Sequence, residues 1–302
     1  SGAAATLLGK IYLRNHDYAN AKTYIDMVLN SGQYELESDF KYVWSENNKY
    51  GKEMIFALLH ETGNNAAEIA CHFGPSDHPE VPGRWQYYGV SLPFWRSYDK
   101  EDPRREFFYY DYTGDAKRDD QSDYGFHYMV PEEGVTVVPN DTTKYMQNVA
   151  TMKYKYDMIS DAYYDGRTIC IFRLSDVILC KAEIENNLNG PAAALPYLNQ
   201  IRARAGAPEY GKHNRFPAPS TKEAMNDAIL KERGYELVFE FQRRADLIRF
   251  GKYEEVVNAH LKKLGIAQPT NVTSSLRYFP YPLNDAQLNP NLAAENPSRL
   301  PK

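Results

Sequence analysis

Two separated segments of the chain share a pattern of small and apolar residues that is typical of packed helix pairs. Residues 3–31 and 172–205 each show apolar positions at helical spacing on either side of a central break. Within each segment, two small residues stand twelve positions apart and are followed by an apolar residue four positions later. These small residues are Gly9 with Ala21, and Ala182 with Ala194. The shared spacing predicts two helical hairpins of the tetratricopeptide type, in which small side chains let helices approach closely.

The stretch between the hairpins, residues 33–165, loses helical periodicity and is rich in Tyr, Gly, Pro, Asp and Asn. It is far longer than the usual connection of about 4–6 residues, so we expect a functional, loop-rich layer with its own packing. Residues 54–59 and 134–138 are its best short-strand candidates. The predicted fold is therefore mainly α, with tetratricopeptide-like helix pairs packed against an irregular layer that holds a few short strands.

The last third of the chain returns to helical patterning. Ser220 and Glu223 have the spacing of a capping box, which predicts a helix from 221 to 241. On that helix three glutamates share the apolar face, and buried carboxylates need cationic partners. The glutamates are Glu232, Glu236 and Glu240, and the candidate partners are Arg202, Arg204, Arg243, Arg244 and Arg249. Residues 278–302 hold five prolines and no periodicity, which predicts an extended tail.

Composition excludes several classes of protein. A formal net charge of −5 argues against a nucleic-acid binder, and no apolar run is long enough to span a membrane. The three cysteines lie far apart, and Cys170 and Cys180 fall in apolar runs that predict buried thiols. The chain begins Ser1-Gly2 without an initiator Met or a leader, so we expect a portion of a longer protein.

The sequence lacks the common catalytic, cofactor and metal motifs. Gly-rich nucleotide loops, zinc-protease helices and serine elbows are missing from the sequence. Cys71, His72 and His78 lack a fourth ligand at useful spacing. An acidic cluster departs from calcium-loop spacing; it consists of Asp115, Asp119, Asp120 and Asp123. We therefore expect no cofactor and no metal.

Five ordered motifs in the second half of the chain resemble the SusD/RagB family of Bacteroidetes outer-membrane lipoproteins. They are 171–183 (IFRLSDVILCKAE), 198–206 (LNQIRARAG), 232–240 (ERGYELVFE), 244–252 (RADLIRFGK) and 281–297, with Asp102-Pro103-Arg104 as a further match. The ending Glu295-Asn296-Pro297-Ser298-Arg299 departs from the Gln-Asn-Pro-Gly-Tyr-like ending usual in the family.

The resemblance implies one integrated domain that lacks its N-terminal portion, with a hairpin at 1–32, a ligand-binding layer at 33–165 and a helical part at 166–302. It also implies a cell-surface protein of the bacterial outer membrane that binds oligosaccharides and is not an enzyme. Such proteins pass glycans to a SusC-like TonB-dependent porin. Their lipid anchor would lie outside this chain.

Sugar recognition needs flat aromatic faces and side chains that hydrogen-bond hydroxyl groups. One loop, flanked by Pro82-Gly83 and Gly89, offers both. The predicted glycan-binding residues are Arg84, Trp85, Gln86, Tyr87 and Tyr88 of this loop, with His72, Asn64 and Asn65 from the same irregular stretch. Trp95, by its apolar spacing, is expected to be structural rather than a contact.

Two alternatives remain open from the sequence. A helical-repeat scaffold would bind a protein or peptide in its concave groove, and its exposed aromatic residues would lie along the helix pairs. A glycosidase would use Glu236 and Glu240, because residues four apart on a helix meet the carboxylate separation of about 5–10 Å that glycoside hydrolysis needs.

Overall fold

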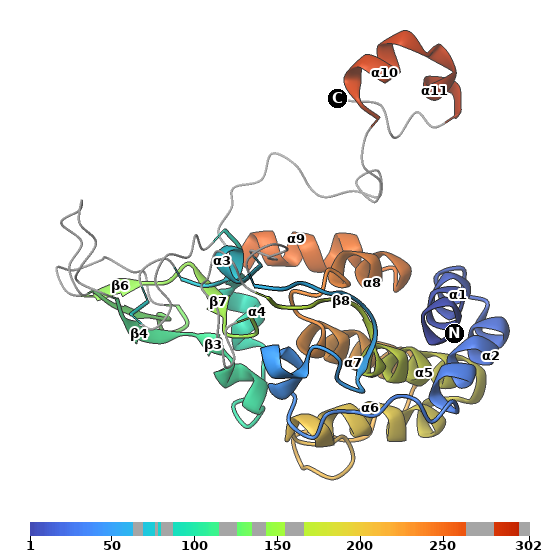
Figure 1. Ribbon diagram of the computed structural model, residues 1–302, viewed down its shortest axis with the longest axis horizontal. Helices are drawn as coiled ribbons and strands as arrows, with labels where there is room; N and C mark the ends of the chain where they lie inside the picture. The colour runs from blue at the N-terminus through green and yellow to red at the C-terminus, as the bar shows by residue number, and fades with distance from the viewer. Residues whose placement is uncertain are drawn as a thin grey trace. The chain divides into compact units, whose positions relative to one another are not determined.

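The structure is a computed structural model, and its internal contacts divide the chain into two units, Ser1–Glu240 and Phe241–Lys302 (Figure 1). It describes residues 1–62, 69–75, 78–79, 87–114, 126–134, 143–154, 166–263 and 281–295. Helices make up most of the regular structure, which confirms the mainly α class.

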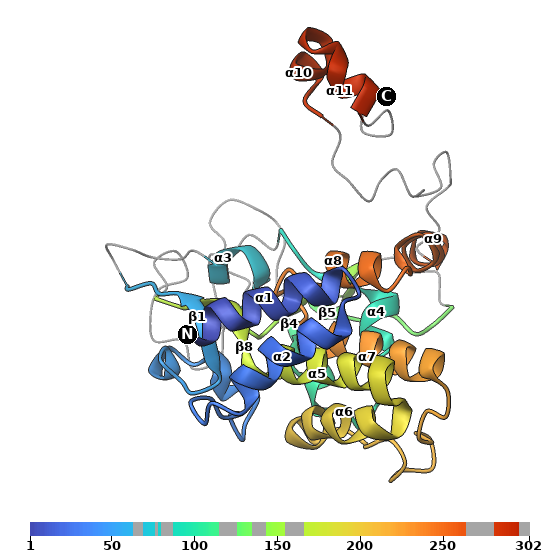
Figure 2. The same cartoon turned by 90° about the vertical axis from the view of Figure 1, so that its right-hand side faces the viewer.

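Both predicted hairpins are present in the first unit. Helices α1 (Gly2–Arg14) and α2 (Tyr18–Leu29) form one, and α5 (Leu174–Asn189) and α6 (Pro191–Ala205) form the other. Helix α2 packs against α5, so the four helices succeed one another in the order α1, α2, α5 and α6 (Figure 2). The second hairpin begins two residues later than the pattern indicates, because its first residues belong to a strand.

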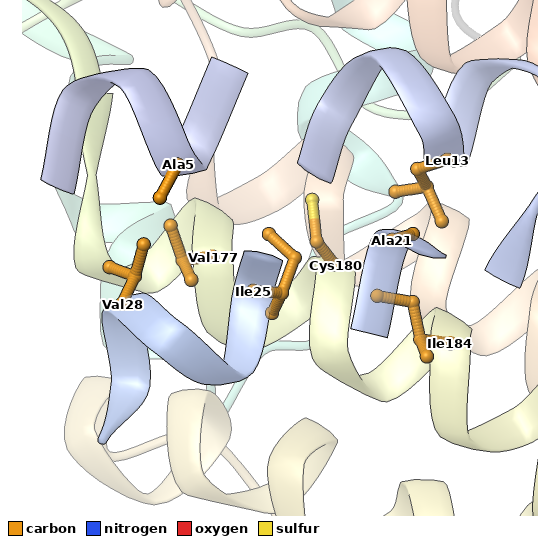
Figure 3. Packing of buried hydrophobic residues seen from close by; sticks show 8 residues of the cluster. All are labelled: Ala5, Leu13, Ala21, Ile25, Val28, Val177, Cys180 and Ile184. Atoms are coloured by element: carbon orange, nitrogen blue, oxygen red, sulfur yellow. The ribbon is translucent and has the colours of Figure 1, made fainter. Parts of the chain in front are cut away.

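Close approach of α1 and α2 depends on small residues. A Cβ atom on Gly9 would lie 2.8 Å from Cδ1 of Ile25, and Ala21 is completely buried. The cluster between the helices in Figure 3 comprises Ala5, Leu13, Ala21, Ile25, Val28, Val177, Cys180 and Ile184. The core thus joins both hairpins, and Cys180 is the buried thiol that the sequence predicts.

Helix α7 (Lys222–Glu236) differs from its prediction at both ends. Its N-cap is Thr221, whose hydroxyl accepts a hydrogen bond from a backbone amide three residues on, so the predicted cap at Ser220 is one residue off. The helix ends at Glu236, five residues before the predicted end, because the chain leaves helical geometry there and reaches a positive φ of 62° at Phe239. Glu240 therefore lies beyond the helix.

The layer between the hairpins contains the short strands that were expected and also short helices, which the sequence pattern did not indicate. Strand β1 (Met54–Leu58) confirms the candidate at 54–59 and pairs antiparallel with β8 (Ile169–Arg173). A three-stranded sheet has the order β2 (Val90–Ser91), β7 (Asn148–Thr151), β3 (Phe108–Tyr109), and another has the order β4 (Asp111–Thr113), β5 (His127–Met129), β6 (Thr143–Tyr145). The short helices are η1 (Tyr42–Trp44), η2 (Glu46–Asn48), α3 (Ile69–Phe73), α4 (Leu92–Arg96) and η3 (Pro103–Glu106). Most of the strand candidate at 134–138 lies outside the described residues.

The second unit contains helices α8 (Arg243–Arg249), α9 (Tyr253–Lys263), α10 (Leu283–Leu288) and α11 (Pro290–Glu295). The last two show that the expectation of an extended tail is wrong for residues 283–295. Prolines suggested an extended chain, yet Pro282 stands at the N-cap of α10 and Pro290 is the first residue of α11. Proline fits the first turn of a helix because the amide it lacks has no intrahelical partner there. Within the part of the chain that the structure describes, every helix is too short or too polar to cross a membrane.

Candidate functional site

Two exposed tyrosines and a histidine come together where α3 meets the segment before β2. Tyr87 and Tyr88 have exposed fractions of 65% and 56%, whereas His72, on α3, is half-buried. The imidazole centroid lies 5.5 Å from the Tyr87 ring and 6.3 Å from the Tyr88 ring. The amide of Tyr88 donates to the carbonyl of His72 at 3.1 Å, which fixes the two segments to each other. We call these three residues the aromatic surface.

A buried aromatic cluster supports the aromatic surface from below. The Phe73 ring lies 5.3 Å from Tyr88, 5.1 Å from Tyr154 and 4.9 Å from Phe239. The Tyr154 hydroxyl donates to the carbonyl of Phe239 at 2.9 Å. Ring pairs at these separations contribute beyond the area they bury, so the exposed tyrosines stand on a packed base.

The backbone beside the aromatic surface depends on a glycine. A Cβ atom on Gly89 would lie 2.6 Å from Oδ1 of Asn148, the residue at the start of β7. The segment can therefore pass close to the sheet and enter β2, which leaves Tyr87 and Tyr88 outside the sheet and exposed.

The aromatic surface has the chemistry that polyhydroxylated ligands require. Phenol and imidazole rings offer apolar faces, and their polar atoms donate and accept hydrogen bonds. Of the predicted glycan-binding residues, His72, Tyr87 and Tyr88 lie in contact with one another. The others, Asn64, Asn65, Arg84, Trp85 and Gln86, lie outside the described residues.

Sequence reasoning missed the support that Phe73 and Phe239 give to this surface. Residues 73 and 239 come from different segments, and their contact exists only in the folded chain. The expectation for Trp95 is confirmed, because its side chain is buried and its indole nitrogen donates to the carbonyl of Arg105 at 3.2 Å.

The three glutamates singled out in the sequence are buried and paired. Glu232 receives one hydrogen bond from Arg104 at 2.6 Å and another from Arg202 at 2.7 Å. These bonds use both carboxylate oxygens, Oε1 and Oε2. Glu232 is therefore part of a structural ion pair, in which cationic side chains compensate a buried carboxylate.

Glu236 is surrounded by three guanidinium groups, those of Arg104, Arg173 and Arg204. Arg173 donates to it at 2.8 Å and Arg104 at 3.1 Å, and Arg204 forms a further short ion pair. Burial by itself raises the pKa of the Glu236 carboxyl, but the three arginines outweigh it and hold that pKa well below its ordinary value. An acid catalyst of glycoside hydrolysis needs the opposite shift.

Glu240 completes the buried charge network from beyond the end of α7. Arg173 donates to it at 2.7 Å, and the ammonium group of Lys153 binds both Glu240 and the carbonyl of Val238. Arg173 also reaches Glu53 at 2.7 Å, just before β1. Among the five proposed arginine partners, Arg202 and Arg204 are present in this network. Arg104, Arg173 and Lys153 are partners that the sequence pattern did not indicate.

Among the residues that the structure describes, no group of three or more His, Cys, Asp or Glu side chains is arranged to hold a metal ion. The acidic cluster Asp115, Asp119, Asp120 and Asp123 lies outside them.

Most of the chain is similar to proteins of one family. A model of the SusD family matches residues 52–298. A SusD-like protein of Formosa agariphila is 39% identical over 120 residues, which cover 40% of this chain and 22% of the relative. The starch-binding protein SusD of Bacteroides thetaiotaomicron is 28% identical over 137 residues, 45% of this chain and 22% of the relative.

Solved structures share the fold over nearly the whole chain. Surface glycan-binding protein A of Bacteroides thetaiotaomicron, in complex with laminarihexaose, aligns with a TM-score of 0.67 at 22% identity. The alignment covers 95% of this chain and 62% of that one. The longer alignments cover 51% to 62% of the matched proteins, so this chain spans about half to three fifths of their length.

Proposed function

Because this chain belongs to the SusD family, we propose that it is a carbohydrate-binding protein that captures oligosaccharides on the aromatic surface. The observation that carries the proposal is the exposure of Tyr87 and Tyr88 beside His72. Exposed rings fixed on a packed base lose little conformational freedom when a ligand stacks on them. Arg84, Trp85 and Gln86 precede Tyr87 directly in the chain, and the proposal includes them together with Asn65.

The relatives support glucans as the first ligands to test. One relative is named as starch-binding, and one structural neighbour holds laminarihexaose. Both ligands are neutral glucose polymers, whose pyranose rings present a C–H face to an aromatic ring and hydroxyl groups at the edge. The aromatic surface offers both kinds of contact.

The proposal extends to cellular role. By family, the protein acts at the surface of the bacterial outer membrane, without catalysing a reaction, and delivers oligosaccharides to a SusC-like TonB-dependent transporter. The pairing of Glu236 with three arginines argues against Glu236 as the acid catalyst of a glycosidase, because its carboxyl is held in the ionised form.

A specific observation favours the scaffold alternative as a second candidate. Leu7, Leu8 and Ile11 are exposed on α1, and their spacing places them in an aliphatic strip along that helix. An exposed apolar strip on a helix is suited to contact with protein. A peptide-binding scaffold would use this strip, whereas a glycan binder would use Tyr87 and Tyr88.

Calorimetric titration of laminarihexaose and maltohexaose into this chain tests the proposal. We expect the double variant Tyr87→Ala/Tyr88→Ala to weaken glycan binding roughly tenfold or more, because stacking area is lost. Tyr50→Ala is the matched control, since Tyr50 is 79% exposed and lies outside the aromatic surface. Equal affinity of the double variant and the control would reject the aromatic surface. Binding to no member of a broader plant, host and microbial glycan panel would reject the carbohydrate function.

A further inference from the structure

A cavity of about 410 Å³ lies between α4, the end of β3 and the segment after β5. Its volume falls in the range of about 300–1,000 Å³ that small-molecule sites occupy. Its lining includes Trp95, which supports the wall, and Lys100, Arg105, Tyr110, Glu132 and Glu133. None of them belongs to the aromatic surface, which stands on the opposite side of β2 in the chain.

One wall of the cavity is a stack of aromatic rings and a cation. The Trp95 and Tyr110 rings are 5.3 Å apart with an interplanar angle of 30°, and the Arg105 guanidinium lies 4.1 Å from the Trp95 ring centroid. Trp95 is buried, whereas Tyr110 is half-buried and lines the cavity. The wall is held in place, because the Trp95 indole donates to the Arg105 backbone.

Arg105 carries a hydrogen-bond donor that the fold leaves unused. Its Nε atom is buried and has no hydrogen-bond partner among the residues that the structure describes. The Nε atom is closed to solvent, so a ligand in the cavity would be met by the rest of the Arg105 guanidinium group.

The charges of the lining select the kind of ligand. The lining holds three cationic side chains, those of Arg96, Lys100 and Arg105, and three carboxylates, those of Asp111, Glu132 and Glu133. A ligand with a net charge would be attracted by one half of this lining and repelled by the other. A hydroxyl group both donates and accepts, so a neutral polyol can satisfy the arginine and the glutamates together.

We propose that this cavity is a second carbohydrate subsite that takes a single neutral pyranose unit, with Arg105 donating to a ring hydroxyl and Tyr110 contacting the ring. The inference rests on the proposed carbohydrate function and adds a separate place of contact. A glycan bound at two places is held more tightly than at either alone, provided that its length matches their separation.

Saturation-transfer NMR with methyl β-glucopyranoside is the direct test, with methyl β-glucuronide and glucosamine as anionic and cationic comparisons. We expect the neutral glycoside to bind more tightly than either charged sugar. Arg105→Met keeps an apolar stem against Trp95 but removes the donors, and it should weaken binding roughly tenfold or more. Arg215→Met is the matched control, because Arg215 also packs on an aromatic ring, that of Phe216, and lies outside the cavity.

A second variant protects the test against loss of folding. Glu132 and Glu133 are exposed, so Glu132→Gln/Glu133→Gln leaves the core intact and should weaken methyl β-glucopyranoside binding severalfold. Unchanged binding in this variant and in Arg105→Met, with circular dichroism showing a folded chain, would overturn the proposal. So would tighter binding of either charged sugar, or no binding of the neutral glycoside to the unaltered chain up to about 50 mM.

The two proposals fail in different ways. Tyr87→Ala/Tyr88→Ala should leave methyl β-glucopyranoside binding unchanged while it weakens laminarihexaose binding. If Tyr87→Ala/Tyr88→Ala weakens oligosaccharide binding while Arg105→Met leaves the binding of both sugars unchanged, the subsite alone is overturned. If Arg105→Met weakens monosaccharide binding while Tyr87→Ala/Tyr88→Ala leaves oligosaccharide binding unchanged, the subsite is supported and the aromatic surface is rejected.

Discussion

The Nη1 atom of Arg173 lies 2.8 Å from Oε1 of Glu236 and joins the end of strand β8 to the last turn of helix α7 across 63 positions of sequence. Both side chains are almost completely buried. Charges taken out of water are tolerated only when partners and hydrogen bonds compensate them. The buried charge network is therefore a condition for the loop layer and the helices to pack together.

Removal of Arg173 should be strongly destabilising. Arg173→Met leaves Glu53, Glu236 and Glu240 with fewer cations, and we expect the free energy of unfolding to fall by about 3–5 kcal/mol. Urea denaturation followed by circular dichroism measures it. The comparison is Lys52→Met, which breaks an exposed ion pair and should cost less than about 1 kcal/mol. Similar losses in the two variants would contradict a structural role for the network.

Acid should weaken the fold through depressed carboxyl pKa values. Burial raises the pKa of Asp176, but Lys10 and Arg233 outweigh it and hold that pKa well below its ordinary value, as three arginines do for Glu236. A depressed pKa in the folded state gives stability above the unfolded-state pKa and loses it as the pH falls toward the folded-state pKa. We expect the free energy of unfolding to decline from about pH 5 downward. Urea denaturation between pH 7 and pH 2 would reveal it, and a flat profile below pH 5 would argue against these pairs.

Gly9→Ala should destabilise the first hairpin, although alanine is the better helix former. A Cβ at this position meets the Ile25 side chain at 2.8 Å, and overpacking of this kind costs about 1–3 kcal/mol. The gain in helix propensity is about 1 kcal/mol in the other direction. In an Ile25→Ala background the clash disappears, so the same substitution should cost less or stabilise. A stabilising Gly9→Ala in the unaltered chain would show that the helices have room to separate.

The cysteine thiols should be unreactive until the chain unfolds. Cys71, Cys170 and Cys180 are buried thiols outside any disulfide, and burial raises the pKa of the Cys170 thiol well above its ordinary value. The thiolate is the reactive form, so both burial and pKa oppose modification. Titration with a thiol-reactive disulfide reagent should label all three cysteines in urea and none promptly in buffer. Rapid labelling of Cys170 in buffer would contradict its burial.

The hairpins could be predicted because their information is local. Helical periodicity and the interval from Gly9 to Ala21 lie within one segment, and the packed helices follow from them. The burial of Glu232 was likewise visible in its place on an apolar helix face, and its partner Arg202 comes from the preceding helix.

The features that the sequence did not indicate depend on contacts between distant residues or on local backbone geometry. Arg104 reaches Glu232 from 128 positions away, and no periodic pattern connects them. The end of α7 follows from a positive φ at Phe239, a conformation that sequence normally signals by glycine. The helices after Pro282 and Pro290 show that a proline can begin a helix as well as interrupt one.

The buried charge network includes three residues of the loop layer, Glu53, Arg104 and Lys153, which form ion pairs with the rest of the network. The stretches between these residues include the aromatic surface and both small sheets, and they can differ in length and sequence while the ion pairs stay the same. The proposed ligand-binding residues therefore differ from the residues of the buried charge network. Substitutions in the proposed residues can change a ligand contact without removing the ion pairs on which packing depends.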